Sequence, residues 1–174
     1  MFKVGDLVLY GCNGVCKIND ITAIEFDKSS KKRLYYVLKP VYQECTISTP
    51  VEHNQIPMRP IITLEEAEHI ISKIPHVKAE MYHSSVLREL TEHYDVFMNT
   101  YECKELMELC MSIYNKRQIL QEENKKLGAT DERYLKQAED LLFGELAIVF
   151  GVQPSEVPAL ISNRLQEDWQ NFCS

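Results

Sequence analysis

The spacing of apolar residues changes once along the chain, from a period of two to a period of about 3.6. At the start, Leu7 and Leu9 alternate with Val8 and Tyr10, which is the period of a pleated strand. Asn13-Gly14, with Gly11 nearby, supplies the positive φ that a tight turn needs, and residues 15–18 start the return strand. The first eighteen residues therefore predict strand, turn and strand.

Further short strands are expected up to about residue 62. They cover residues 21–26, 33–41, 46–49 and 58–61. Pro50 stops the third of these, and Pro60 restricts the last to a sheet edge. About five strands in sixty residues predict a small, partly open five-stranded β-barrel of the SH3 or Tudor type over residues 1–62. Such a barrel leaves edges with which a partner can pair.

Helical periodicity begins at Thr63. Thr63 and Glu66 have the spacing of a capping box, which predicts a helix from there to about Ile74. Four more helices are expected: residues 85–98, one capped by Thr100 and stopped by Gly128, one capped by Thr130 and ended by Gly151, and one from about Ser155. Residues 63–174 thus read as an all-helical bundle, and the whole chain as α+β.

Composition and charge narrow the class of protein. Apolar residues make up 45% of the chain and charged residues 26%, as in soluble globular proteins. No apolar run reaches the ~20 residues of a membrane helix, so we expect a cytoplasmic protein without a membrane partner. The net charge of −7 divides into +2 for residues 1–62 and −9 for residues 63–174. An acidic helical domain is poorly suited to binding DNA through bulk electrostatics.

No catalytic pattern is visible. A nucleophile elbow needs Ser between its glycines, and a phosphate loop needs Gly-Lys-Ser/Thr; the glycine-rich start has neither. The five histidines are scattered, and none is spaced as a partner of a nucleophile or carboxylate. We expect no enzyme activity, no cofactor and no small-molecule substrate.

The six cysteines leave one alternative from a different class of protein. Cys12, Cys16 and Cys45, with His53, could form a metal site, but structural zinc sites usually show two tight ligand pairs. Without a Cys-x-x-Cys pair, free buried thiols and no metal are favoured.

Two motifs carry a resemblance to a known family. Phe2-x-Val4-Gly5-Asp6-x-Val8-x-Tyr10, followed by Asn13-Gly14-Val15, resembles the opening of the CarD/CdnL family of bacterial transcription regulators. The same module is the RNA polymerase interacting domain of transcription-repair coupling factor. Residues 130–134 and 138–147 resemble the fourth helix of the same family, so the likeness covers nearly the whole chain in order.

The resemblance implies a mode of action. Family members bind the β-subunit lobe of bacterial RNA polymerase through the N-terminal barrel, here through Thr46, Ile47, Ser48 and Thr49. An Arg that some members use there falls at Ser48, which leaves pairing through the backbone. The helical domain of the family touches promoter DNA at the upstream edge of the melted region and stabilises the open complex, including in rRNA transcription.

The DNA-binding residues depart from the family pattern. The family's wedge Trp lies near Met81-Tyr82 here, while the sole Trp of this chain is Trp169, which is spaced as part of the last helix's apolar face. Tyr82 is either a smaller stacking surface or a packing tyrosine. Residues 116–136 hold six Lys/Arg against four Asp/Glu, and the cations expected to meet DNA are Arg88, Lys116, Arg117, Lys125 and Lys126.

The sequence therefore predicts a non-catalytic regulator that binds the RNA polymerase β subunit, and promoter DNA weakly and mainly within the polymerase complex. The alternative within binding proteins is a polymerase-bound adaptor whose acidic helices contact another protein. The cysteine-ligated metal protein is the alternative outside that class.

Overall fold

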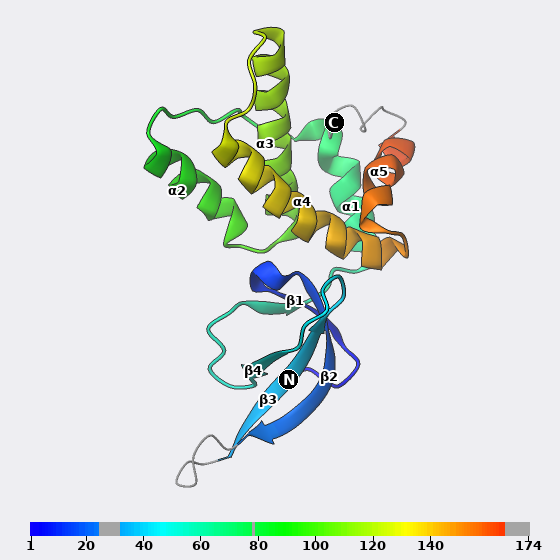
Figure 1. Ribbon diagram of the computed structural model, residues 1–174. Helices are drawn as coiled ribbons and strands as arrows, with labels where there is room; N and C mark the ends of the chain where they lie inside the picture. Colours follow the sequence, from blue (N-terminus) through cyan, green and yellow to red (C-terminus); the bar gives the residue numbers. More distant parts are fainter. Residues whose placement is uncertain (25–31, 78, 166–174) are drawn as a thin grey trace. The chain divides into compact units, whose positions relative to one another are not determined.

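A computed structural model describes the chain over residues 1–24, 32–77 and 79–165 (Figure 1). The chain divides into two units, Met1–Ile61 and Ile62–Ser174. The first unit is built of strands and the second of helices, so the protein is α+β, as the change of period predicts. Two predictions fall outside the described residues. They are the position of Trp169 on the apolar face of the last helix and the end of the strand predicted for residues 21–26.

Five strands form one antiparallel sheet in the first unit. They are β1 (Leu7–Tyr10), β2 (Val15–Ile24), β3 (Arg33–Pro40), β4 (Ile47–Pro50) and β5 (Met58–Pro60). Their order across the sheet is β4-β3-β2-β1-β5, so β4 and β5 are its edges (Figure 1). Pro60 occupies an edge strand, the position to which a missing N–H restricts it.

The strands predicted for residues 15–18 and 21–26 are one continuous strand, β2. A β-bulge between Ile18 and Asp20 adds one residue to β2 opposite β3. Ile18 therefore pairs with Leu38, and Ile21 with Tyr36. The extra residue shifts the alternation of side chains between the two faces of the sheet by one position. Ile18 and Ile21, three residues apart, therefore both lie in the apolar core of the sheet.

The connection between β1 and β2 uses the glycines singled out in the sequence. It is a short 3-10 turn, Gly11–Asn13, in which φ is 48° at Gly11, followed by φ of 70° at Gly14. Both values lie in the left-handed region that glycine adopts without steric cost.

The sheet is not closed, so the predicted small, partly open barrel of SH3 or Tudor type is not confirmed. It is nevertheless strongly curved. β1 and β4 stand three strand spacings apart, about 14 Å in a flat sheet. Yet the Tyr10 hydroxyl donates a buried hydrogen bond of 2.9 Å to Thr49 Oγ1. The curvature encloses a small core around Val8, Ile18 and Leu38, each fully buried.

In the described part of the second unit, the chain forms five α-helices. They are α1 (Leu64–Lys73), α2 (Leu87–Met98), α3 (Cys103–Glu122), α4 (Ala129–Phe150) and α5 (Val157–Leu165). The predicted apolar stripes of α3 and α4 pack against each other in the centre of this unit (Figure 1). The buried Glu145 carboxylate on α4 accepts hydrogen bonds from the Ile62 N–H at 2.9 Å and the Cys103 thiol at 3.0 Å.

The structure confirms two predicted helix ends and corrects the ends around α3. The capping box of Thr63 and Glu66 forms, and Gly151 ends α4 in the left-handed conformation with φ of 68°. Thr100 does not cap α3, because α3 begins at Cys103 with Glu102 as its N-cap; the Thr100 hydroxyl accepts from the Glu102 N–H at 3.2 Å and donates to the Phe97 carbonyl at 2.7 Å. Gly128 does not stop α3; it precedes α4 as its N-cap, so Thr130 lies inside that helix.

Candidate functional site

The β4 edge was expected to contact polymerase, and it is an open edge of the sheet. Val51 N–H, just past β4, donates to the Leu34 carbonyl at 2.9 Å, so Val51 points its N–H toward β3. Antiparallel pairing alternates, so the N–H groups of Thr49 and Ile47 also face β3, and that of Ser48 faces away. Pro50, which has no N–H, occupies the other outward position.

Side chains alternate along β4 as well. Ile47 packs against the core of the sheet, and Thr49 is only 2% exposed and accepts the Tyr10 hydrogen bond. Thr46 and Ser48 are exposed. The four residues thus divide into two that anchor the strand and two that face outward, and Ser48 offers both its side chain and its backbone N–H to a partner.

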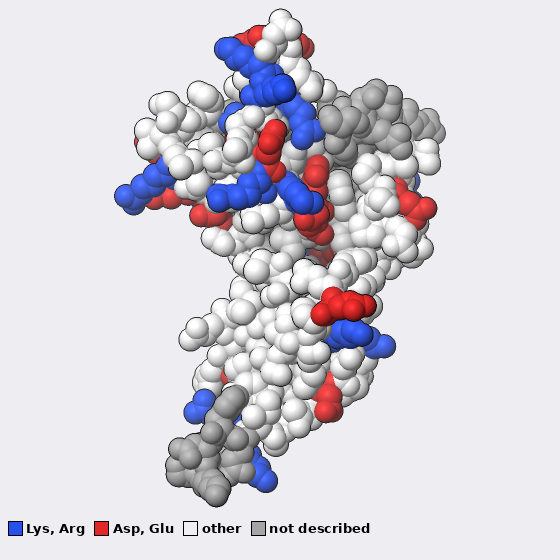
Figure 2. Space-filling view, viewed as in Figure 1, with Lys and Arg blue, Asp and Glu red and all other residues white. Residues whose placement is uncertain are grey.

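Basic side chains gather over the C-terminal end of α3 and the first turns of α4, on the face seen in Figure 2. We call this the basic surface; its exposed cations are Lys125, Lys126, Arg133 and Lys136. Lys125 pairs with Glu123 at 2.8 Å and Lys136 with Asp140 at 3.4 Å. Lys126 forms no ion pair within the described ranges.

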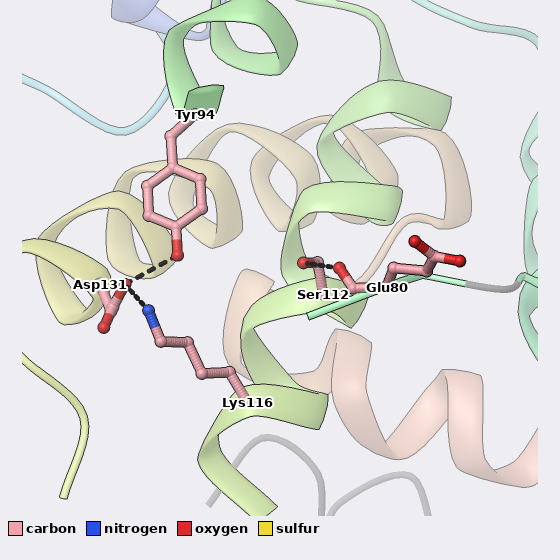
Figure 3. Close-up of polar contacts among 5 residues, drawn as sticks. All are labelled: Glu80, Tyr94, Ser112, Lys116 and Asp131. Atoms are coloured by element: carbon pink, nitrogen blue, oxygen red, sulfur yellow. Dashed lines mark hydrogen bonds and ion pairs between the residues drawn. The ribbon is translucent and has the colours of Figure 1, made fainter. Parts of the chain in front are cut away.

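Lys116 does not belong to that surface, contrary to expectation. Its residue is 4% exposed, and its ammonium lies 2.8 Å from the buried Asp131 carboxylate (Figure 3). The same Asp131 oxygen accepts a hydrogen bond of 2.7 Å from the Tyr94 hydroxyl. Burial, followed by the hydrogen bond to Asp131, raises the pKa of Tyr94 well above its usual value. An ammonium held in this way is not available to a phosphate, so its burial argues against the DNA contact expected of Lys116.

Arg117 and Arg88 have different surroundings. Arg117 is half-buried; its guanidinium lies 5.8 Å from the centre of the Tyr114 ring, and its Nη1 is buried without a hydrogen-bond partner among the described residues. Arg88 is on the surface of α2, where it pairs with Glu92 at 2.6 Å. Both side chains of that pair are more than half exposed, so water and salt weaken the pair, and Arg88 can exchange Glu92 for a phosphate.

Tyr82 packs against the helices. Its ring stacks on His93 with centroids 3.8 Å apart and an interplanar angle of 12°. His93 in turn meets the edge of Phe97. Burial lowers the pKa of His93. Of the two interpretations of Tyr82, the packing tyrosine describes its position here, because one face of its ring is already covered.

The three cysteines named as possible metal ligands differ in their exposure to solvent. Cys12 and Cys45 are exposed, while Cys16 is buried. Burial, with a smaller effect of Cys45, raises the pKa of the Cys16 thiol to about 11, so it is neutral at pH 7 and a weak metal ligand. Within residues 1–24, 32–77 and 79–165, no three side chains of the metal-binding types gather at one point. None of the described helices has the length and apolar character needed to cross a membrane.

Comparison with known proteins finds a family match for the sheet unit. Residues 2–62 match the CarD-like/TRCF RID domain family. The sheet unit of this chain is therefore a CarD-like domain. It is also 22% identical over 158 residues to a Bacillus subtilis (strain 168) protein named "Putative transcription factor YdeB", an alignment that covers 90% of this chain and 97% of that protein.

The CarD-like match defines the class of protein. The RID module is the RNA polymerase interacting domain, so this CarD-like protein is an RNA polymerase-interacting transcription factor. The matched residues include all five strands, and β4 with its open edge lies within them.

Sequence reasoning missed which cations of residues 116–136 are exposed. Arg133 is not among the cations that the sequence points to, although it is exposed one turn into α4 and lies over the Tyr134 ring at 5.1 Å. The available signal was helical spacing: Lys116 lies three residues after Ile113, on the apolar side of α3.

Proposed function

We propose that this CarD-like protein binds the β subunit of RNA polymerase through the β4 edge and modulates the stability of promoter open complexes, including those of rRNA promoters. The observation that carries the proposal is the open β4 edge within the CarD-like domain, anchored from inside by Ile47 and Thr49. A partner strand would meet the outward N–H of Ser48. Because polymerase works in the cytoplasm, we expect the protein to act there.

The decisive experiment changes one backbone group. Ser48→Pro removes the outward N–H and leaves the bonds to β3 in place, whereas Ile47→Pro would break the sheet itself. Ser48→Ala is the matched control, because it removes the hydroxyl and keeps the N–H. We expect Ser48→Pro to weaken binding to the isolated β lobe by about tenfold and Ser48→Ala to change it little.

The β4 proposal is wrong if folded Ser48→Pro protein binds the lobe as tightly as the parent does. Folding of the variant is checked by its amide NMR spectrum, in which the Tyr10 and Thr49 signals report on the intact core of the sheet.

We further propose that the basic surface positions promoter DNA once polymerase holds the protein. The helical domain carries −9, so its own affinity for DNA is low, and docking must supply a high local DNA concentration. Lys126 and Arg133 are the cations best placed to meet phosphates, with Arg88 on α2 as an additional one. Tyr82 would act as a wedge only after leaving its stack on His93.

Open-complex lifetime tests the DNA contact. We expect Lys126→Ala/Arg133→Ala to shorten the lifetime on a promoter, and to lower the salt dependence by about one counterion for each cation removed. The matched control is Lys73→Ala/Lys104→Ala, which removes the same charge from exposed positions on α1 and the start of α3. Equal lifetimes for parent and first variant, with polymerase binding intact, would contradict the DNA role.

A second candidate function has its own supporting observation. The acidic charge of the helical domain, together with the covered Tyr82 ring, favours a polymerase-bound adaptor whose helices contact another protein. Equal lifetimes in the previous experiment are the result that this adaptor function predicts.

A further inference from the structure

A cavity of about 380 Å³ lies in the helical unit between α1, the 3-10 turn Ile74–His76 that follows it, and the start of α3. Its lining residues are His69, Ile70, Lys73, His76, Val77, Lys104, Met107 and Glu108. We call it the α1–α3 cavity. Its size falls in the lower part of the range of small-molecule sites, about 300–1,000 Å³.

The lining separates into an apolar part and a charged part. Met107 is 2% exposed, and Ile70 and Val77 are half-buried against the core, so these three form the inner wall. Lys73 and Lys104 are exposed and stand at the mouth. This arrangement matches a ligand with an apolar body and a polar head.

The net charge of the lining residues indicates which polar head group a ligand of this cavity carries. Neither Lys73 nor Lys104 forms an ion pair within the described parts of the chain, and the one acidic lining residue is Glu108. Two ammonium groups against one carboxylate leave one positive charge unbalanced. An anion that reaches both ammonium groups gains two charge-assisted contacts, since its oxygens accept from each of them.

We propose that the α1–α3 cavity binds a small amphipathic monoanion, a carboxylate carried by an apolar chain of medium length. The chain lies against Ile70, Val77 and Met107, and the carboxylate lies at Lys73 and Lys104. The site is separate from the β4 edge and from the basic surface, and the proposal does not depend on either. It adds a ligand-binding site to a transcription factor for which no ligand is otherwise indicated.

Octanoate is the probe, and methyl NMR of the full-length protein is the measurement. A ligand of this size binds a matching site with a Kd of about 1 mM. Titration to about 10 mM should shift the methyl signals of Met107, Ile70 and Val77 saturably, and leave those of Leu9 in the other unit unchanged. 1-Octanol, which has the same chain without the charge, should bind at least about tenfold more weakly.

Charge variants locate the head group. Lys73→Met/Lys104→Met keeps most of each side-chain stem and removes both charges, and should raise the Kd for octanoate about tenfold or more. Lys126→Met, an equally exposed lysine elsewhere, is the control and should leave the Kd unchanged. The inference is overturned if octanoate causes no saturable shift, if 1-octanol binds as tightly, or if Lys126→Met weakens binding as much as the double variant.

Discussion

The buried ion pair of Lys116 and Asp131 leads to the sharpest prediction. Asp131→Ala would remove the counter-charge of an ammonium that is 5% exposed at the side chain, and also the acceptor of the Tyr94 hydroxyl (Figure 3). Both groups would be left without a partner inside the contact region of α2, α3 and α4. The variant therefore tests whether Lys116 is an interior residue or a surface cation.

The magnitude follows from the cost of an unpaired buried charge. Removing one partner of a buried pair costs about 3–5 kcal/mol, and the unpaired tyrosine hydroxyl adds to that. We expect Asp131→Ala to lower the free energy of unfolding by about 4 kcal/mol, a large fraction of the 5–15 kcal/mol typical of a domain. Lys116→Met/Asp131→Asn, which removes both charges and keeps an acceptor for Tyr94, should cost clearly less than Asp131→Ala.

Urea denaturation followed by far-UV circular dichroism is a suitable assay, because the signal near 222 nm reports mainly the helical unit. The control is Arg88→Met, which breaks the exposed pair with Glu92, whose side chains are 84% and 60% exposed. Such a pair contributes at most about 0.5 kcal/mol.

The reasoning fails if Asp131→Ala costs no more than Arg88→Met does. Lys116 would then be hydrated in solution, and it would again be a candidate for contacting DNA phosphates. If the large loss is observed, Lys116→Ala is unsuitable as a DNA-binding variant, because loss of fold would be mistaken for loss of contact.

Three further predictions concern single groups. Thr63→Ala removes the capping box of α1 and should cost about 1 kcal/mol in urea denaturation, whereas Thr130→Ala, inside α4, should cost less. Gly151→Ala should cost about 1 kcal/mol, because φ is 68° there and no atom lies within 4 Å of the added Cβ to compensate. NMR titration should give His93 a pKa below its usual 6.5, and Tyr82→Ala should raise that pKa by uncovering the ring. Because His93 in the unfolded chain takes up a proton at a higher pH than in the folded chain, the free energy of unfolding should fall as pH drops through 6.5.

Local patterns predicted most of the secondary structure. The alternation in residues 7–10 and the 3.6-residue period after Thr63 each depend on which face of one element is buried, and this is visible within a few residues. The capping box at Thr63 and the left-handed Gly151 are also local, since their hydrogen bonds close within one turn. The motif from Phe2 to Val15 was enough to indicate the CarD-like family.

The errors at helix ends have a common cause. Thr100 and Gly128 are good cap and stop residues by type, but the loops around α3 have several such residues within a few positions. Which one is used depends on where α3 and α4 meet, and that contact is not encoded in the local sequence. The prediction of separate strands at residues 15–18 and 21–26 failed for a similar reason, because the bulge at Asn19 exists only in the pairing with β3.

The candidate site shows the same division between sequence and tertiary structure. The sequence alone determined that residues 46–49 form a short, Pro-terminated edge and that residues 116–136 are basic. Only the folded chain decided that the N–H of Ser48, rather than that of Ile47, faces away from β3, because the direction depends on pairing with β3. Lys116 is interior because its ammonium and the hydroxyl of Tyr94, on another helix, both donate to the buried carboxylate of Asp131, fifteen residues later. Solvation of a charge depends on the groups that surround it in space, so residue type and sequence position alone could not separate Lys116 from Lys126.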